Sequence, residues 1–283
     1  MYRISAADFA ALAFVSLASC VTTQEEEDGF LGTAPTPLEY INALNPNALV
    51  PNALVPNALV PNALVPNALA PGALSPAALS AIQDPGAAGD LSRQFLSYVV
   101  GCALTPSQSF SFSWTDAGGT VHEEVYAGLI GLAPGWATKP LGQTEQQWVS
   151  ACLGSRVNWY GASVIISSRA SHAALDKTGS AELSTYTQQE GAFWGNLFDP
   201  SPYLHACYHE PNRDYARSML RECAAGHLGA GGSVVECGLI HILGSCDSHC
   251  LPLNPSGQYY PTCVDNLTGP PDATTKVVTV FLQ

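Results

Sequence analysis

Proline occupies every fifth position from Pro46 to Pro76, within near-identical units that read Pro-Asn-Ala-Leu-Val. Proline lacks a backbone N–H and pushes the residue before it toward extended geometry, so this spacing forbids a continuous α-helix or a central β-strand. We therefore expect residues 42–84 to form a turn-rich or polyproline-like spacer. At about 3.1 Å per residue, a stretch of roughly 35 such residues would extend over about 110 Å.

The repeats also admit a second interpretation. Each unit carries a leucine and most carry a valine, and one unit cannot bury these side chains alone. Repeats that stack on one another bury such side chains together. A small solenoid or a self-associating apolar tract is therefore the alternative to the spacer.

The first twenty residues have the three parts of an export signal. Arg3 supplies a positive charge, residues 9–17 form a short apolar run, and the small residues Ala18 and Ser19 precede Cys20. The pattern Leu-Ala-Ser-Cys resembles the signal of bacterial lipoproteins at each of its four positions. The resemblance implies that residues 1–19 are a signal peptide and that Cys20 is the first mature residue. It also implies a diacylglycerol on the Cys20 thiol and an acyl chain such as palmitate on its amino group, which together hold a protein firmly to a lipid bilayer.

Residues 20–41 are expected to be an acidic, extended segment, because they carry several Glu and Asp and show no apolar period. Val21 is not acidic, and by the same resemblance this favours the outer membrane over the inner one. No later segment reaches eighteen apolar residues, the minimum for a membrane-spanning helix. We therefore expect an exported protein that is lipid-anchored to the cell envelope and faces the cell surface.

The net charge of the chain limits which classes of partner it can bind. The chain has 283 residues and a net charge of −13, from 10 Lys and Arg against 23 Asp and Glu. An excess of acidic groups argues against nucleic acid as a partner and against an electrostatic grip on anionic lipid. The expected partners are the bilayer, through acylated Cys20, and an envelope protein or a glycan.

The cysteines support an oxidising compartment. The chain has nine, and if Cys20 carries lipid, an even number remains. In an exported protein eight thiols indicate up to four disulfides, with 105 possible pairings. The expected disulfide cysteines are Cys102, Cys152, Cys207, Cys223, Cys237, Cys246, Cys250 and Cys263.

Residues 90–283 are expected to be one compact, disulfide-rich α+β head, because helical and strand patterns alternate without a regular βαβ order. Asp90 is a candidate N-cap for the first helix, and Thr144 to Gln147 read as a capping box for the second. Cys102 and Cys152 lie on these helices, so a bridge between them is one candidate pairing, with the other six cysteines pairing among themselves. The expected elements are helices over 90–102 and 144–157, strands over 109–114, 120–132, 164–167 and 276–282, and a strand or close-packed loop within 184–198.

A second resemblance covers most of residues 42–198. The Asn-Ala-Leu repeats and the segments 96–104, 148–153 and 190–193 are similar to a group of uncharacterised exported proteins from myxobacteria. The resemblance implies an exported location and a similar layout, and it implies no activity.

Two sets of residues are candidates for chemistry. His205, Cys207 and His209 alternate in a way that suits zinc, and the segment Cys246 to Cys250, which contains His249, could add ligands. Because exported cysteines are usually oxidised and an oxidised cysteine does not ligate, we expect disulfides, no metal and no cofactor.

Glu190 lies near Phe193, Trp194 and Asn196, a mixture that resembles the lining of a sugar site. Glycoside cleavage needs two carboxylates, and only Asp199 is near in sequence, so the alternative is an aromatic core with one solvated glutamate.

Three arginines at four-residue spacing, Arg213, Arg217 and Arg221, predict either an anion-binding helix face or a solvated stripe. The sequence contains no Gly-x-Ser-x-Gly elbow, no phosphate-binding loop and no His-Glu-x-x-His motif. We therefore expect a non-catalytic binding or envelope-structural lipoprotein. The alternatives are a tethered hydrolase acting on glycan or peptide, centred on Glu190 or on His205 and His209, and an assembly protein driven by the repeats.

Overall fold

The computed structural model describes residues 76–265 and 273–283. These residues belong to one compact, disulfide-rich α+β unit, as the sequence predicts. The main sheet is mixed, which the sequence did not indicate. Cys20, the acidic segment and the repeats up to residue 75 lie outside the described residues. Within the described part of the chain, no helix is long and apolar enough to cross a membrane.

The first described helix is α3 (Pro76–Gln83). Pro76 is the last proline of the five-residue series, and a proline is well tolerated in the first turn of a helix. Ala78, Ala81 and Ile82 are buried against the rest of the unit. Residues 76–83, which the sequence assigned to the spacer, are therefore part of the folded head.

The second helix, α4 (Ala87–Ala103), begins three residues earlier than predicted, and Gly86 rather than Asp90 is its N-cap. Asp90 lies in the first turn and forms an ion pair with Arg93. The Arg93 guanidinium also donates to the backbone carbonyl oxygen of Ile82 at 2.9 Å. This contact ties α3 to α4.

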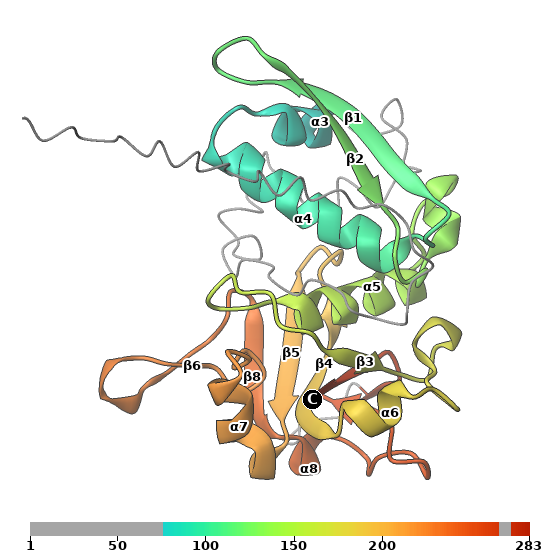
Figure 1. Cartoon of the computed structure of the whole chain (residues 1–283), viewed down its shortest axis with the longest axis vertical. Helices are drawn as coiled ribbons and strands as arrows, with labels where there is room; N and C mark the ends of the chain where they lie inside the picture. Colours follow the sequence, from blue (N-terminus) through green and yellow to red (C-terminus); the bar gives the residue numbers. More distant parts are fainter. Residues whose placement is uncertain (1–75, 266–272) are drawn as a thin grey trace, which may run out of the picture. The chain divides into compact units, whose positions relative to one another are not determined.

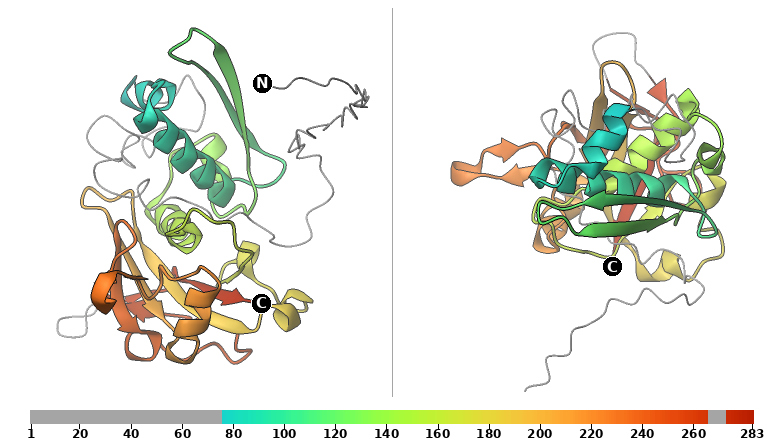
Figure 2. Two further views of the ribbon diagram at one scale, coloured as in Figure 1. Left: turned by 60° about the vertical axis from the view of Figure 1, so that its left-hand side comes forward. Right: turned by 90° about the horizontal axis from the view of Figure 1, so that it is seen from above.

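The predicted hairpin is present as β1 (Ser109–Thr115) and β2 (Val121–Ala127), which pair in antiparallel register. Phe110 and Phe112 point to the buried side, as their alternation with serine predicts. At the turn, the Asp116 carboxylate accepts from the backbone N–H of Gly118 at 2.9 Å and of Thr120 at 2.8 Å. The hairpin packs on α4 (Figures 1 and 2).

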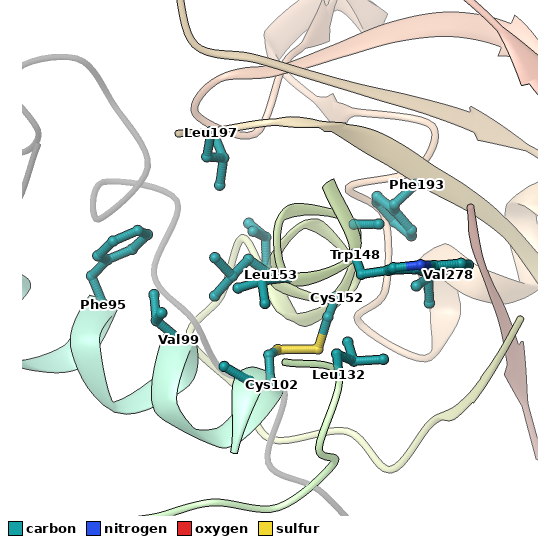
Figure 3. Close-up of a cluster of buried hydrophobic side chains, with 14 of the residues drawn as sticks. Phe95, Val99, Cys102, Leu132, Trp148, Cys152, Leu153, Phe193, Leu197 and Val278 are labelled. Carbon is teal, nitrogen blue, oxygen red and sulfur yellow. A yellow bond between two sulfur atoms is a disulfide. The ribbon is translucent and has the colours of Figure 1, made fainter. Parts of the chain in front are cut away.

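Helix α5 (Gln143–Arg156) lies between α4 and the main sheet (Figure 1). Its predicted capping box is wrong: Gly142 is the N-cap, and the Glu145 carboxylate accepts from the Gly142 backbone N–H at 2.8 Å. Thr144 is therefore already inside the helix. Because α5 is covered on both sides, Val149, Cys152 and Leu153 are all buried. Figure 3 shows Cys152 and Leu153 within this core.

The main sheet has five strands in the order β3-β11-β4-β5-β8. All neighbours are antiparallel except β5 and β8, which run parallel. The expected strand at 164–167 begins only at Ser167. The strands of this sheet are β3 (Ser167–Arg169), β4 (Gln188–Asn196), β5 (Tyr203–Tyr208), β8 (Ile240–Ser245) and β11 (Val278–Leu282).

The two faces of β4 pack differently. Phe193 belongs to the large core beneath α5, whereas Trp194 belongs to a smaller core on the other face with cysteines of the disulfide-rich segment. Short elements complete the unit. They are α6 (Glu182–Thr185), α7 (Arg213–Ser218), α8 (Cys246–His249), β6 (His227–Leu228), β7 (Val234–Val235), β9 (Cys263–Val264) and β10 (Ala273–Thr274).

Four disulfides are present, and one joins α4 to α5 as predicted (Figure 3). The other six cysteines pair among themselves, which also agrees with the sequence prediction. The four bonds are Cys102–Cys152, Cys207–Cys246, Cys223–Cys237 and Cys250–Cys263. This number of disulfides is consistent with an exported domain.

Candidate ligand-binding site

A pocket of about 650 Å³ lies where the start of α5, the end of β4 and the start of β5 meet. Its lining combines two aromatic side chains, two amides, two threonine hydroxyls and one charged group of each sign. The lining residues are Gln143, Gln147, Trp194, Gly195, Tyr203, Asp265, Ala273, Thr274, Thr275 and Lys276.

The local sequence explains the positions of three of these residues. Gln143 and Gln147 are four residues apart, which places them on one face of α5. Gly195 has a φ of 145°, and a Cβ there would lie 2.4 Å from the carbonyl oxygen of Tyr203. Only glycine lets β4 approach β5 this closely at the pocket.

Trp194 is 1% exposed, and its indole Nε1 has no hydrogen-bond partner among the described atoms. Buried N–H groups in native proteins almost always have a partner. Trp194 lines the pocket, so a ligand oxygen or a water molecule there is a natural acceptor for this donor.

A row of side chains continues from Trp194 across the outer face of the sheet. Trp194 pairs with His205 on β5, and His205 pairs with His241 on β8. The ring centroids are 6.0 Å apart in the first pair and 5.9 Å apart in the second. His205 also lies 5.6 Å from the Tyr203 ring and places its Nε2 3.5 Å from the Asp265 carboxylate.

The electrostatics of this row centre on His205. Burial lowers the pKa of His205 from its ordinary value, and the nearby His241 and His249 lower it further. The Asp265 carboxylate acts in the opposite direction. The net effect favours a neutral imidazole at pH 7.

Glu190, the predicted sugar-site acid, is not in the pocket. Its carboxylate is completely buried and forms an ion pair with Arg221, with contacts of 3.0 and 3.1 Å. Glu190 is therefore neither a solvated glutamate nor a general acid facing a substrate. Burial raises its pKa, which Arg221 opposes.

The predicted helix face of Arg213, Arg217 and Arg221 is not formed either. Arg213 and Arg217 lie on α7, but α7 ends at Ser218, and Arg221 is buried against Glu190. Arg213 pairs with Glu210, and Arg217 pairs with Asp214. The three guanidiniums therefore do not form one anion-binding face.

The alternation of His205, Cys207 and His209 does not give the zinc site considered from the sequence. Cys207 is bonded to Cys246, so its sulfur is not a thiolate. The sulfurs of Cys207, Cys246 and Cys250 lie within 4.8 Å of one another, yet all three are in disulfides. His209 follows the end of β5, and its backbone N–H donates to the Glu190 carbonyl oxygen at 2.9 Å.

Sequence analysis missed most of the pocket. Gln143 and Gln147 carried a usable signal, because two amides at four-residue spacing mark one helix face. Asp265 and the segment 273–276 carried none, because they reach the pocket only through the disulfides and the pairing of β11 with β4.

No protein-family model matches this sequence, and comparison with curated proteins and with solved structures found no significant match.

Proposed function

We propose that this chain is a lipid-anchored, extracytoplasmic binding protein whose pocket takes a neutral polar ligand, with a glycan as the best fit. Cys20 holds the chain to the bilayer, the repeats act as a spacer, and the head presents the pocket. The proposed location rests on the resemblance of residues 17–20 to the bacterial lipoprotein signal, together with the four disulfides. The non-catalytic role rests on the pocket.

The composition of the pocket is the observation that supports binding. Amides, hydroxyls and aromatic rings are the groups that hydrogen-bond and stack on a polar, uncharged ligand. The two-carboxylate chemistry of most glycoside hydrolases needs a pair of acids across the substrate. Among the described lining residues, Asp265 is the single carboxylate, and it lies 3.5 Å from the His205 Nε2 rather than opposite a second acid. The pocket therefore favours holding a ligand over cleaving it.

Binding is tested with the mature, oxidised chain and a panel of soluble neutral oligosaccharides, measured by calorimetry. Tyr203→Ala and Gln147→Ala are expected to weaken binding of a responding oligosaccharide by about tenfold or more, which corresponds to about 1.4 kcal/mol. Tyr160→Ala is the matched control, because Tyr160 is an exposed aromatic outside the pocket. Equal losses in Tyr203→Ala and Tyr160→Ala would contradict the assignment of the pocket.

The anchor is tested separately. Intact mass before and after reduction reports lipid at Cys20 and eight oxidised thiols in one measurement. Cys20→Ser is expected to move the protein out of the membrane fraction. A variant that still sediments with membranes as the parent does would refute the anchor. Deletion of residues 45–75, which keeps α3 and the head, is expected to leave oligosaccharide binding unchanged if the repeats act only as a spacer.

A further inference from the structure

We infer that the pocket recognises the acetamido group of an N-acetylated amino sugar. This inference rests on the proposed function, since it names the kind of glycan that the same pocket would hold. The residues that support it are Trp194 and Asp265. Each of them lines the pocket and has a buried polar atom without a hydrogen-bond partner.

The two unpaired atoms are of opposite kinds. The Trp194 indole Nε1–H is a donor, and the Asp265 Oδ1 is an acceptor. Both atoms are buried, and neither has a hydrogen-bond partner in the part of the chain that the structure describes. Because nearly all buried polar groups in native proteins are paired, this combination favours a ligand that offers both an acceptor and a donor.

The two side chains lie in the same part of the pocket, because both are neighbours of His205. The centroids of the Trp194 and His205 rings are 6.0 Å apart. The Asp265 Oδ2 lies 3.5 Å from the His205 Nε2. The Asp265 side chain is 20% exposed, so its carboxylate has room to rotate toward a ligand.

The charges of the lining favour a neutral ligand group over a charged one. Among the described lining residues, Asp265 is the one acid and Lys276 the one base, so their charges cancel. Burial lowers the pKa of His205, so its neighbouring ring adds no charge at pH 7. A free amine would be repelled by Lys276, and a carboxylate would be repelled by Asp265.

A secondary amide has the required properties. It is neutral, and it carries one N–H donor and one C=O acceptor. Its carbonyl oxygen would accept from the Trp194 Nε1–H, and its N–H would donate to the Asp265 carboxylate. In a sugar, this group is the acetamido substituent of an N-acetylated hexosamine.

The rest of the lining favours a sugar over a peptide as the bearer of this amide. Gln143, Gln147 and two threonine hydroxyls offer hydrogen bonds to ring hydroxyls, and Tyr203 offers an aromatic surface. Ala273 is the only purely aliphatic side chain among the described lining residues. The pocket therefore has no apolar subsite for the side chain of a peptide.

The test uses the mature, oxidised chain and three trisaccharides that differ only in the substituent at C2 of each ring. They are the β1,4-linked trimers of N-acetylglucosamine, glucosamine and glucose, and calorimetry measures the affinity for each. We expect the N-acetylated trimer to bind at least about tenfold more tightly than the other two, because it alone pairs both buried atoms.

Two variants test the assigned contacts. Trp194→Phe removes the indole N–H and keeps an aromatic ring, and Asp265→Ala removes the carboxylate. Each is expected to lower the preference for the N-acetylated trimer over the glucose trimer from about tenfold to below about threefold. This ratio separates loss of the acetamido contact from a general weakening of binding.

Asp214→Ala is the matched control, because Asp214 is 84% exposed and lies outside the pocket. It is expected to keep the preference of the parent. Trp194 is buried, so circular dichroism checks that Trp194→Phe folds. The Asp265 side chain is partly exposed, so Asp265→Ala should fold even if Trp194→Phe does not. An unchanged preference in Asp265→Ala would overturn the inference.

The outcomes separate this inference from the proposed function. Three trimers that bind equally, or a failure of these trimers when another neutral oligosaccharide binds, would overturn the inference alone. An N-acetylated dipeptide of alanine that binds as tightly as the N-acetylated trimer would overturn it in favour of a peptide. If no neutral oligosaccharide binds at all, the proposed function itself fails.

Discussion

Glu190 and Arg221 form an ion pair in which neither side chain is exposed to solvent. Two nitrogens of the guanidinium donate to the two carboxylate oxygens, at 3.0 and 3.1 Å. Arg221 also donates to the backbone carbonyl oxygens of Ser155 and Val157, at 2.9 and 2.7 Å. The pair therefore connects the central strand β4 to the carboxyl end of α5.

Glu190→Gln is expected to lower the free energy of unfolding by about 3–5 kcal/mol, because it leaves Arg221 buried without its counter-charge. Urea unfolding followed by circular dichroism measures the change. The control is Asp214→Asn, since Asp214 is 84% exposed in its pairs with Arg213 and Arg217. Surface pairs of this kind contribute about 0–1 kcal/mol. A loss below 1 kcal/mol in Glu190→Gln would mean that the pair is not formed as described.

The stability of the head is expected to fall as the pH drops below about 6.5, in part through His172. Burial lowers the pKa of His172 from its ordinary value of 6.5, and its Nδ1 accepts from the Ala174 backbone N–H at 3.2 Å. The unfolded chain then takes up a proton before the folded one, so stability is lost as pH falls through the unfolded pKa. His172→Asn keeps an acceptor and removes the titration, so urea midpoints between pH 7 and pH 5 should change less than in the parent. An unchanged pH dependence would contradict the role of His172.

Removal of the Cys102–Cys152 disulfide is expected to lower stability by up to about 4 kcal/mol, because it frees a loop with a sequence separation of 50. The double variant Cys102→Ala, Cys152→Ala is compared with the parent by thermal unfolding. The Cys223–Cys237 pair closes a much shorter loop, with a separation of 14, so its double variant should lose less, about 3 kcal/mol. The opposite order would argue against loop entropy as the cause.

Ile82→Ala is expected to lower stability by about 2–5 kcal/mol, because Ile82 is fully buried between α3 and the rest of the core. The measurement is urea unfolding of the mature chain. Leu79 on the same helix is only partly buried, so Leu79→Ala should cost less. If Ile82→Ala left the free energy of unfolding unchanged, residues 76–83 would belong to the spacer rather than to the folded head.

Elements whose pattern lies within a few neighbouring residues were predicted well from the sequence. The alternation of Phe110 and Phe112 with serine gave the hairpin, and the positions of Cys102 and Cys152 on two helices gave their bridge. The sequence predicted helix starts less well. From the sequence alone, Thr144 is a stronger N-cap candidate for α5 than Gly142, although Gly142 is the actual N-cap. Pro76 fits both the last position of the proline repeat and the first residue of a helix, so the start of α3 was not predicted.

The candidate site was predicted less well for a physical reason. Glu190 looked like a site residue because it is close to aromatic residues in the sequence. Regular alternation along β4 would place it on the same side as Trp194, but the pairing of β4 with β11 is irregular at Glu190, so this alternation does not hold there. Its side chain forms an ion pair with Arg221, 31 residues away. Neither the aromatic segment around Glu190 nor the spacing of the three arginines indicated this pair. The sequence singled out His205 as a candidate residue, but its neighbours His241 and Asp265 reach it through strand pairing and crosslinking that the local sequence does not specify.

The bond between α4 and α5 also determines how the head would bear a mechanical load. Tension that arrives along the chain ahead of Pro76 passes through α3 and α4 to Cys102, and there it crosses directly to Cys152. The chain between these cysteines, which includes the β1–β2 hairpin and the pocket residues Gln143 and Gln147, is bypassed. A pull strong enough to unravel the first two helices would therefore stop at this crosslink and leave that segment unstretched.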